Sequence, residues 1–153
     1  MDTVTYPDHA VQELLSDHFI PVRLDGEQAA QTDRRYHPIW TPTLLVLNEE
    51  GAEIHRVVGY LPPEEFRAEM SLGLAKAHLQ RGALENALVH FRETVDRFPE
   101  TWAAPEAQYW MGVTRYRAEG QPDGLTAEWN VLMERWPESR WAHSASFIRL
   151  AKR

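Results

Sequence analysis

The side chains that most often carry catalysis are scarce or scattered in this chain of 153 residues. There is no cysteine, which excludes disulfides, thiolate metal sites and thiol catalysis within the sequence. Of the seven histidines, no two are spaced i, i+4 as in a helical zinc motif. No glycine-rich phosphate loop and no Gly-x-Ser-x-Gly elbow occurs. The sequence therefore predicts no metal, no cofactor and no enzyme activity, with a histidine-dependent hydrolase or metalloenzyme as a further alternative.

Pro42 is the strongest candidate for a functional backbone position. It lies directly before the apolar run 44–47, and a proline cannot donate a hydrogen bond to a β ladder. It therefore belongs at the first residue of a strand or in a special turn. Trp40 and Thr41 precede it and complete the candidate site. The alternative is that Pro42 only shapes a turn and that Trp40 packs in a core or interface.

Residues 1–72 alternate between helical and strand patterns. Asp8 is suited to cap a helix in which apolar residues recur at helical spacing, and a strand is expected at 19–24. The polar stretch 27–36 is compatible with a helix. Residues 44–47 and 54–58 are expected to form a hairpin, because the turn between them contains Gly51, which tolerates positive φ.

Residues 73–153 are expected to be helical throughout. A helix beginning near Pro63 is followed by others at about 84–98, 104–119, 125–136 and 140–152. Residues also recur at an offset of 38, a period in the range of helical repeats. The pairs are Phe91 and Trp129, Phe98 and Trp136, Pro99 and Pro137, Glu100 and Glu138, Ala104 and Ala142, and Ala107 and Ala145.

The order helix, strand, helix, strand, strand, helix, with Pro42 at the head of the hairpin, resembles a thioredoxin-like domain over about residues 1–72. The resemblance implies that the Thr41–Pro42 bond is cis and that the backbone at Thr41, flanked by Trp40, pairs with an extended peptide. Family members also have a central strand ending in Cys-x-x-C, which performs thiol–disulfide exchange. This sequence lacks both that strand and its cysteines.

The missing strand leaves three alternatives. The natural chain starts upstream of Met1, or the remaining strands close into a three-stranded sheet, or a strand from a second copy or a partner fills the gap. The fold class expected is α/β followed by all-α: an incomplete thioredoxin-like domain of about three strands at 1–72, then a helical region at 73–153. A homodimer through unpaired strands is one possible assembly.

The helical region resembles tetratricopeptide repeats. The first unit matches that pattern at Leu74, Ala75, Gly82, Ala87, Phe91 and Pro99, and the second at Gly112, Gly120, Trp129 and Pro137. The resemblance implies an array of helical hairpins with a concave peptide groove. Tyr109, Val113 and Tyr116 share one helix face and would line that groove. The alternative for these residues, and for the tryptophans, is core packing.

Charge and hydropathy limit the class of partner. The net charge is −7, with 12 acidic and 4 basic residues at 1–65 against 11 and 12 at 66–153. Neither part has the basic excess of a nucleic-acid binder. Apolar runs are too short to span a membrane and no signal peptide is visible, which favours a cytoplasmic protein.

We therefore expect a non-catalytic adaptor that binds a protein or peptide. The alternative is a thiol–disulfide oxidoreductase of the thioredoxin family whose Cys-x-x-C lies upstream of Met1.

Overall fold

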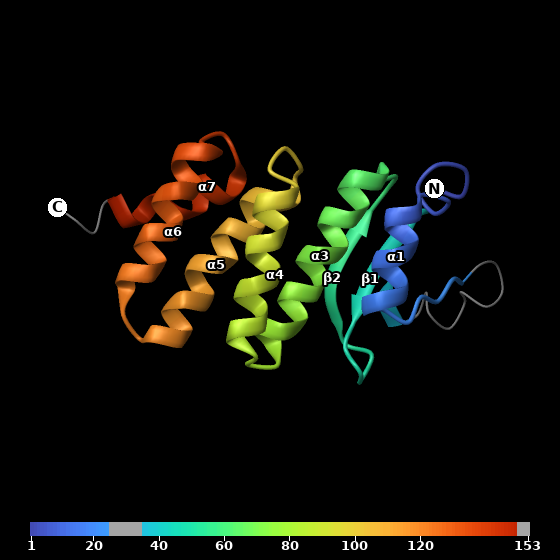
Figure 1. Cartoon of the computed structure of the whole chain (residues 1–153), viewed down its shortest axis with the longest axis horizontal. Coiled ribbons are helices and arrows are strands. Elements are labelled where there is room, and N and C mark those ends of the chain that lie inside the picture. Colours follow the sequence, from blue (N-terminus) through green and yellow to red (C-terminus); the bar gives the residue numbers. More distant parts are fainter. Residues whose placement is uncertain (25–34, 150–153) are drawn as a thin grey trace. The chain divides into compact units, whose positions relative to one another are not determined.

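The computed structural model describes residues 1–24 and 35–149. The chain forms two compact units, Met1–Arg67 and Ala68–Arg153. The boundary falls within helix α3 (Pro63–Gln80), slightly before the boundary at residue 72 that the sequence predicted (Figure 1).

Helix α1 (His9–His18) opens the first unit and begins where the sequence predicted. The Asp8 carboxylate accepts a hydrogen bond of 3.0 Å from the backbone N–H of Val11, which confirms the predicted N-cap. The helix ends at Phe19, whose backbone is extended.

Strands β1 (Thr43–Leu47) and β2 (Glu53–Val58) form the predicted antiparallel hairpin. The Asn48 side chain shapes its turn, because Oδ1 accepts from the backbone N–H groups of Glu50 (3.1 Å) and Ala52 (2.8 Å). Gly51 adopts φ +74°, and a Cβ there would lie 2.9 Å from the guanidinium of Arg35. The turn therefore needs glycine both for its backbone conformation and for space.

The predicted third strand at 19–24 is wrong. These residues join no ladder, and β1 and β2 form the only sheet within the described part of the chain. Ile20 and Val22 are 93% and 74% exposed. A β-prone pattern forms a strand only where a neighbouring backbone supplies hydrogen bonds, and none is supplied here. Most of the predicted helix at 27–36 lies outside the described residues; Arg35 and Tyr36 are helical.

The first unit has a small core in which the N-terminal turn meets the segment that leads into α3. Thr5 is fully buried, and its hydroxyl donates to the carbonyl of Leu61 at 2.6 Å. The Tyr6 ring contacts Phe66 edge to face, with centroids 5.9 Å apart. Val11 and Leu61 are also buried. This core fixes where α3 begins.

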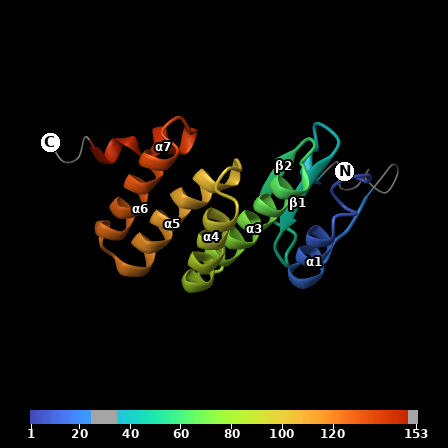
Figure 2. The same ribbon diagram turned by 45° about the horizontal axis from the view of Figure 1, so that its top comes forward.

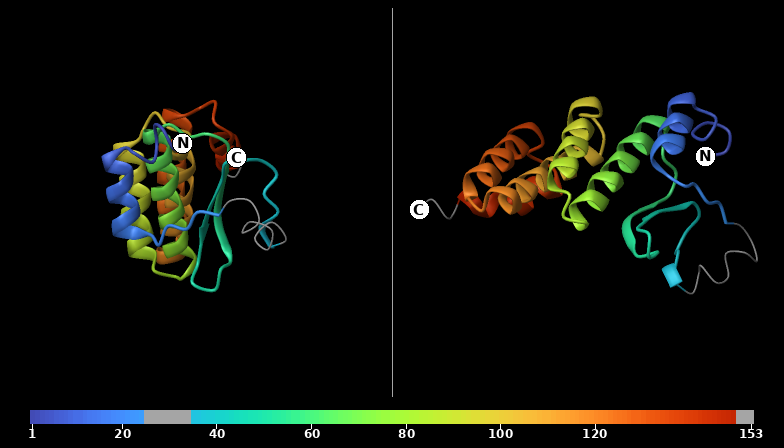
Figure 3. Two further views of the ribbon diagram at one scale, coloured as in Figure 1. Left: turned by 90° about the vertical axis from the view of Figure 1, so that its right-hand side faces the viewer. Right: turned by 60° about the horizontal axis from the view of Figure 1, so that its bottom comes forward.

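The second unit is helical, as predicted. It contains α4 (Leu84–Arg97), α5 (Ala103–Glu119), α6 (Pro122–Arg135), α7 (Arg140–Ala145) and the 3-10 turn η2 (Ser146–Arg149). Figures 2 and 3 show α4, α5 and α6 side by side, with consecutive helices running in opposite directions. No helix among the described residues is long and apolar enough to span a bilayer.

A first apolar cluster joins the C-terminal part of α3 with α4 and α5. Small residues face one another across it, so that the helices approach closely. The imidazole of His78 stacks on that of His90, with ring centroids 5.1 Å apart. The first apolar cluster consists of Ala68, Leu72, Ala75, Leu79, Ala87, Phe91, Val95, Phe98, Ala103, Ala107 and Met111.

A second apolar cluster joins α6, α7 and η2, with Tyr109 and Val113 of α5 packed against it. Trp129 and Trp136 anchor the second apolar cluster through their indole N–H groups. Trp129 donates to the carbonyl of Tyr109 at 2.9 Å, and Trp136 donates to the carbonyl of Pro99 at 3.0 Å. Both bonds satisfy indole N–H groups of partly buried side chains. The first links the two helices of the α5–α6 hairpin, and the second links the end of α6 to the connection between α4 and α5.

A partly buried carboxylate reinforces the contact between α5 and α6. Glu128 accepts from the side chains of Gln108 (2.6 Å) and Arg115 (2.5 Å), and its side chain is only 14% exposed. Between α3 and α5, Lys76 pairs with Glu106. Charge-assisted hydrogen bonds of this kind hold a fixed geometry better than exposed ion pairs do.

Replacing Gly112 should destabilise the helical unit. A Cβ at this position would lie 2.7 Å from Cδ1 of Trp129 and 3.2 Å from the backbone oxygen of Leu125. In Gly112→Ala, overpacking should lower the free energy of unfolding by about 1–3 kcal/mol, and the higher helix propensity of alanine should raise it by about 1 kcal/mol. We expect a net loss of up to about 2 kcal/mol in chemical denaturation followed by tryptophan fluorescence. The control is Val89→Ala on the exposed side of α4. Equal stability of the two variants would contradict the close approach.

Candidate functional site

The segment before Pro42 is fastened to the hairpin turn by Arg35 and Tyr36. The guanidinium of Arg35 donates to the carbonyls of Glu50 (3.1 Å) and Gly51 (2.9 Å). The Tyr36 hydroxyl donates to the same Gly51 carbonyl at 2.7 Å. Arg56 of β2 in turn donates to the Tyr36 carbonyl at 2.5 Å. Four hydrogen bonds therefore hold one end of the loop 37–42.

The other end of this loop is held by the first residues of β1. The Thr43 hydroxyl donates to the carbonyl of Trp40 at 2.6 Å. The backbone N–H of Gly59 donates to the Pro42 carbonyl at 2.8 Å, which extends the β pairing by one residue. The Thr41–Pro42 peptide bond is cis. Pro42 thus occupies the strand-opening position where a residue without an N–H is tolerated.

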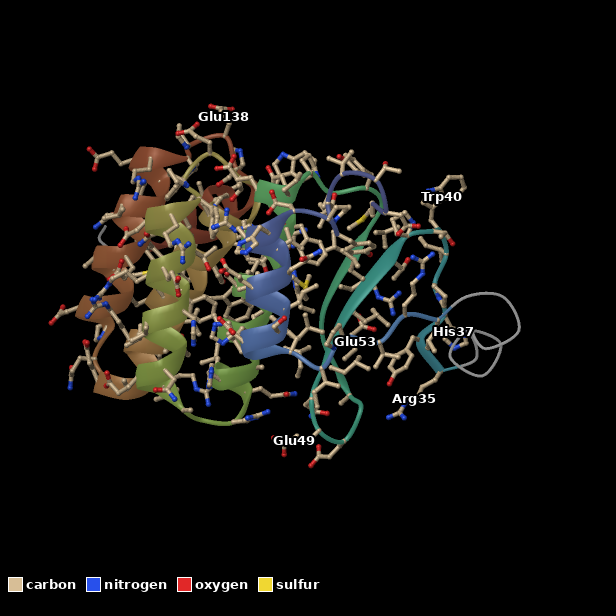
Figure 4. The ribbon with its side chains drawn as sticks, turned by 45° about the vertical axis from the view of Figure 1, so that its right-hand side comes forward. Arg35, His37, Trp40, Glu49, Glu53 and Glu138 are labelled. Atoms are coloured by element: carbon tan, nitrogen blue, oxygen red, sulfur yellow. The ribbon has the colours of Figure 1, made fainter. Side chains whose placement is uncertain are left out.

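Between these two anchors the loop presents apolar side chains to solvent. Ile39 is 84% exposed and Trp40 is 69% exposed. Figure 4 shows the Trp40 ring projecting away from the ribbon at one end of the hairpin, with Glu49 at the other end. His37 adopts φ +46°, which is uncommon for a residue with a side chain. The loop is therefore held in a definite shape while its largest apolar groups stay uncovered.

This loop has no cysteine thiolate to act as a nucleophile. The chain has no thiol, and no group of three or more potential metal ligands occurs among the described residues. An exposed isoleucine and tryptophan on such a loop are suited to bury apolar surface against another chain.

The predicted site residues fall in two places. Trp40, Thr41 and Pro42 lie together in the constrained loop. Tyr109 stacks on Trp129 with centroids 4.7 Å apart and contacts Trp141 at 4.9 Å, and Val113 packs in the same cluster. Tyr116 of the same helix is 48% exposed, so the predicted groove face is largely covered at two of its three positions and open at Tyr116.

Neither Ile39 nor the clamp formed by Arg35, Tyr36 and Arg56 was among the residues predicted from the sequence. Ile39 was detectable, because two large apolar residues side by side in a polar stretch before a proline are unusual in a loop. The clamp was not detectable, because its hydrogen bonds join residues 15 to 20 positions apart through backbone carbonyls.

Arg56 also holds Glu53, its neighbour three residues earlier on β2. Its Nε and Nη2 donate to the two carboxylate oxygens at 2.8 and 2.5 Å, a bidentate pair. The hydrogen bonds from Arg56 lower the pKa of Glu53 below its ordinary value, with the charge of Arg56 adding to the effect, and they raise the pKa of Arg56. The ion pair keeps the Arg56 guanidinium oriented toward Tyr36.

Replacing Arg56 with lysine should raise the pKa of Glu53 toward its ordinary value, because lysine keeps the charge but loses the bidentate geometry. Carbon-detected NMR titration of the Glu53 carboxyl group measures this directly. The carboxylate stabilises the fold above its unfolded-state pKa, and that stabilisation is lost as the pH falls through the lower folded-state pKa. The Arg92→Lys variant, on exposed α4 surface, serves as control. An unchanged Glu53 titration in Arg56→Lys would contradict the bidentate pairing of Arg56 with Glu53.

Comparison with known proteins agrees with the first half of this description. Residues 1–73 match the family model described as a thioredoxin-like domain. No curated protein and no solved structure gives a significant match to the chain. The family match covers 73 of the 153 residues. The N-terminal part of this cysteine-free chain is therefore thioredoxin-like.

Proposed function

We propose that this chain is a non-catalytic binding protein that holds an extended segment of a partner protein against the loop 39–42. The observation that carries the proposal is the exposure of Ile39 and Trp40 on a loop that is hydrogen-bonded at both ends. Burying two large apolar side chains of an already ordered loop against a partner would contribute favourably to the binding free energy.

The energetics favour binding at this loop. Tryptophan is among the residues most often found at interface hot spots, where truncation costs 2 kcal/mol or more. A loop that is already ordered loses little conformational entropy when it binds, so more of the burial energy contributes to affinity. The thioredoxin-like match supports the same site, since in that family the backbone before the cis-proline contacts extended peptides.

The helical unit supports a protein-binding role independently. Its antiparallel helices, its 38-residue spacing and the packing of Trp129 and Trp136, which lie 38 residues after Phe91 and Phe98, agree with tetratricopeptide-like packing. Arrays of this kind are known chiefly as protein-binding scaffolds. Within it, Tyr116 is the predicted contact residue that remains exposed, while Tyr109 and Val113 would act by shaping the surface beside it.

Site-specific crosslinking tests the loop. A photoreactive benzoylphenylalanine at Trp40, in cells that express the chain, should crosslink to a discrete partner that the same group at Val89, equally exposed on α4, does not capture. With the captured partner purified, Trp40→Ala should weaken binding by at least about tenfold, or about 1.4 kcal/mol. Val89→Ala should leave it unchanged. Identical capture at both positions, or full affinity in Trp40→Ala, would count against the loop, and the Tyr116→Ala variant tests the helical surface separately.

The purified chain is expected to have no thiol–disulfide exchange activity. Thiol–disulfide exchange requires a thiolate, and the chain contains none. The purified chain should therefore not accelerate the reduction of insulin by dithiothreitol, with thioredoxin as the positive control. Activity above the uncatalysed rate would overturn the non-catalytic assignment.

A further inference from the structure

The outer edge of strand β1 has no pairing partner among the described residues. The Gly59-to-Pro42 hydrogen bond and the register, Thr43 opposite Val58 and Leu45 opposite Arg56, fix which residues bond to β2. Because hydrogen-bonded and non-bonded pairs alternate along an antiparallel ladder, Thr43 and Leu45 turn their backbone groups away from β2. Their N–H and C=O groups therefore have no strand partner among the described residues and could pair with a further strand.

The two edges of this hairpin differ in how they are protected. Natural edge strands usually carry charges, prolines or bulges that prevent further pairing. Strand β2 carries Glu53, His55 and Arg56. Strand β1 has the sequence Thr-Leu-Leu-Val-Leu, with no charge and no proline, although its ladder is irregular between Val46 and Leu47. The unprotected edge is the one that faces away from β2.

The first unit also contains a segment with a strand-like pattern, residues 19–24, that is not part of its two-stranded sheet. In the extended segment 19–24, Ile20, Val22 and Leu24 occur at alternate positions and are all exposed. Alternation with a period of two is the pattern of a strand with one covered face. A two-stranded hairpin by itself is marginally stable, so an additional strand would stabilise this unit.

Charge decides between the candidate occupants of the β1 edge. Residues 1–65 carry 12 acidic and 4 basic groups, and Glu49 and Glu50 are exposed at the turn that ends β1, where Arg35 supplies one positive charge. A second copy of the chain would bring the same negative charge against this edge, which opposes dimerisation there. A basic segment would be attracted, most strongly at low salt.

We infer that the outer edge of β1 receives an extended segment of a basic partner protein, apolar at alternate positions and flanked by lysine or arginine. The main chain of the segment pairs with Thr43 and Leu45, and its basic flank lies near Glu49 and Glu50, in the manner of β-augmentation. This inference goes beyond the proposed function, because it requires the backbone of β1 and not the Trp40 side chain.

Amide hydrogen exchange with a synthetic probe tests the inference. The probe is acetyl-Lys-Lys-Val-Thr-Val-Thr-Val-amide, added to the full chain at low salt. We expect the Leu45 amide to exchange at least about tenfold more slowly when the probe is bound, because a strand hydrogen bond then covers it. The protection should persist in the Trp40→Ala variant, so a failure of the proposed function would not be confused with a failure of this inference.

Two matched probes define the controls. The same peptide N-methylated on alternate residues cannot pair through its backbone, and it should give no Leu45 protection. A peptide with two glutamates in place of the lysines should bind at least about tenfold more weakly, and the difference should shrink at high salt as the charges are screened. Equal protection by the N-methylated probe, or no protection by any probe, would overturn the inference. A concentration-dependent dimer that protects Leu45 without peptide would overturn it in favour of a second copy.

Discussion

The first unit depends on the hydrogen bonds that tie Arg35 and Tyr36 to the hairpin turn. A hairpin of two strands is only marginally stable in water unless something packs on it or holds its ends. Here the Gly51 carbonyl accepts from two side chains, and Arg56 returns a bond to the Tyr36 carbonyl. These contacts set the shape of the loop that follows, and so the exposure of Trp40 follows from them.

The parts of the fold that local sequence encodes were predictable. Asp8 caps α1, the Asn48 turn closes the hairpin, and the helices of the second unit follow the apolar periodicity. Whether residues 19–24 form a strand was not predictable in the same way, because a strand needs a neighbouring backbone to pair with. Alternation tells which residues favour a strand; it does not supply the chain that a strand must pair with.

The candidate site was predictable where one residue type limits the backbone. Pro42 stands out because a proline before an apolar run has few permitted positions. The apolar pair Ile39 and Trp40 was visible in the sequence, but the exposure of the two side chains depends on tertiary packing. Tyr109 and Tyr116 share a helix face in sequence, yet Tyr109 meets Trp129 and Trp141 while Tyr116 reaches solvent. Periodicity predicts which side chains share a helix face, but how deeply each one is buried depends on the residues that pack against it.

The close approach of α5 and α6 has a consequence for how this sequence can change over evolutionary time. Gly112 gives the space that the indole of Trp129 occupies, and the indole in turn bonds to the backbone of α5. A larger residue at 112 would press on the Trp129 indole, so it fits best with a smaller side chain at 129. We therefore expect the residue tolerated at either position to depend on the residue at the other.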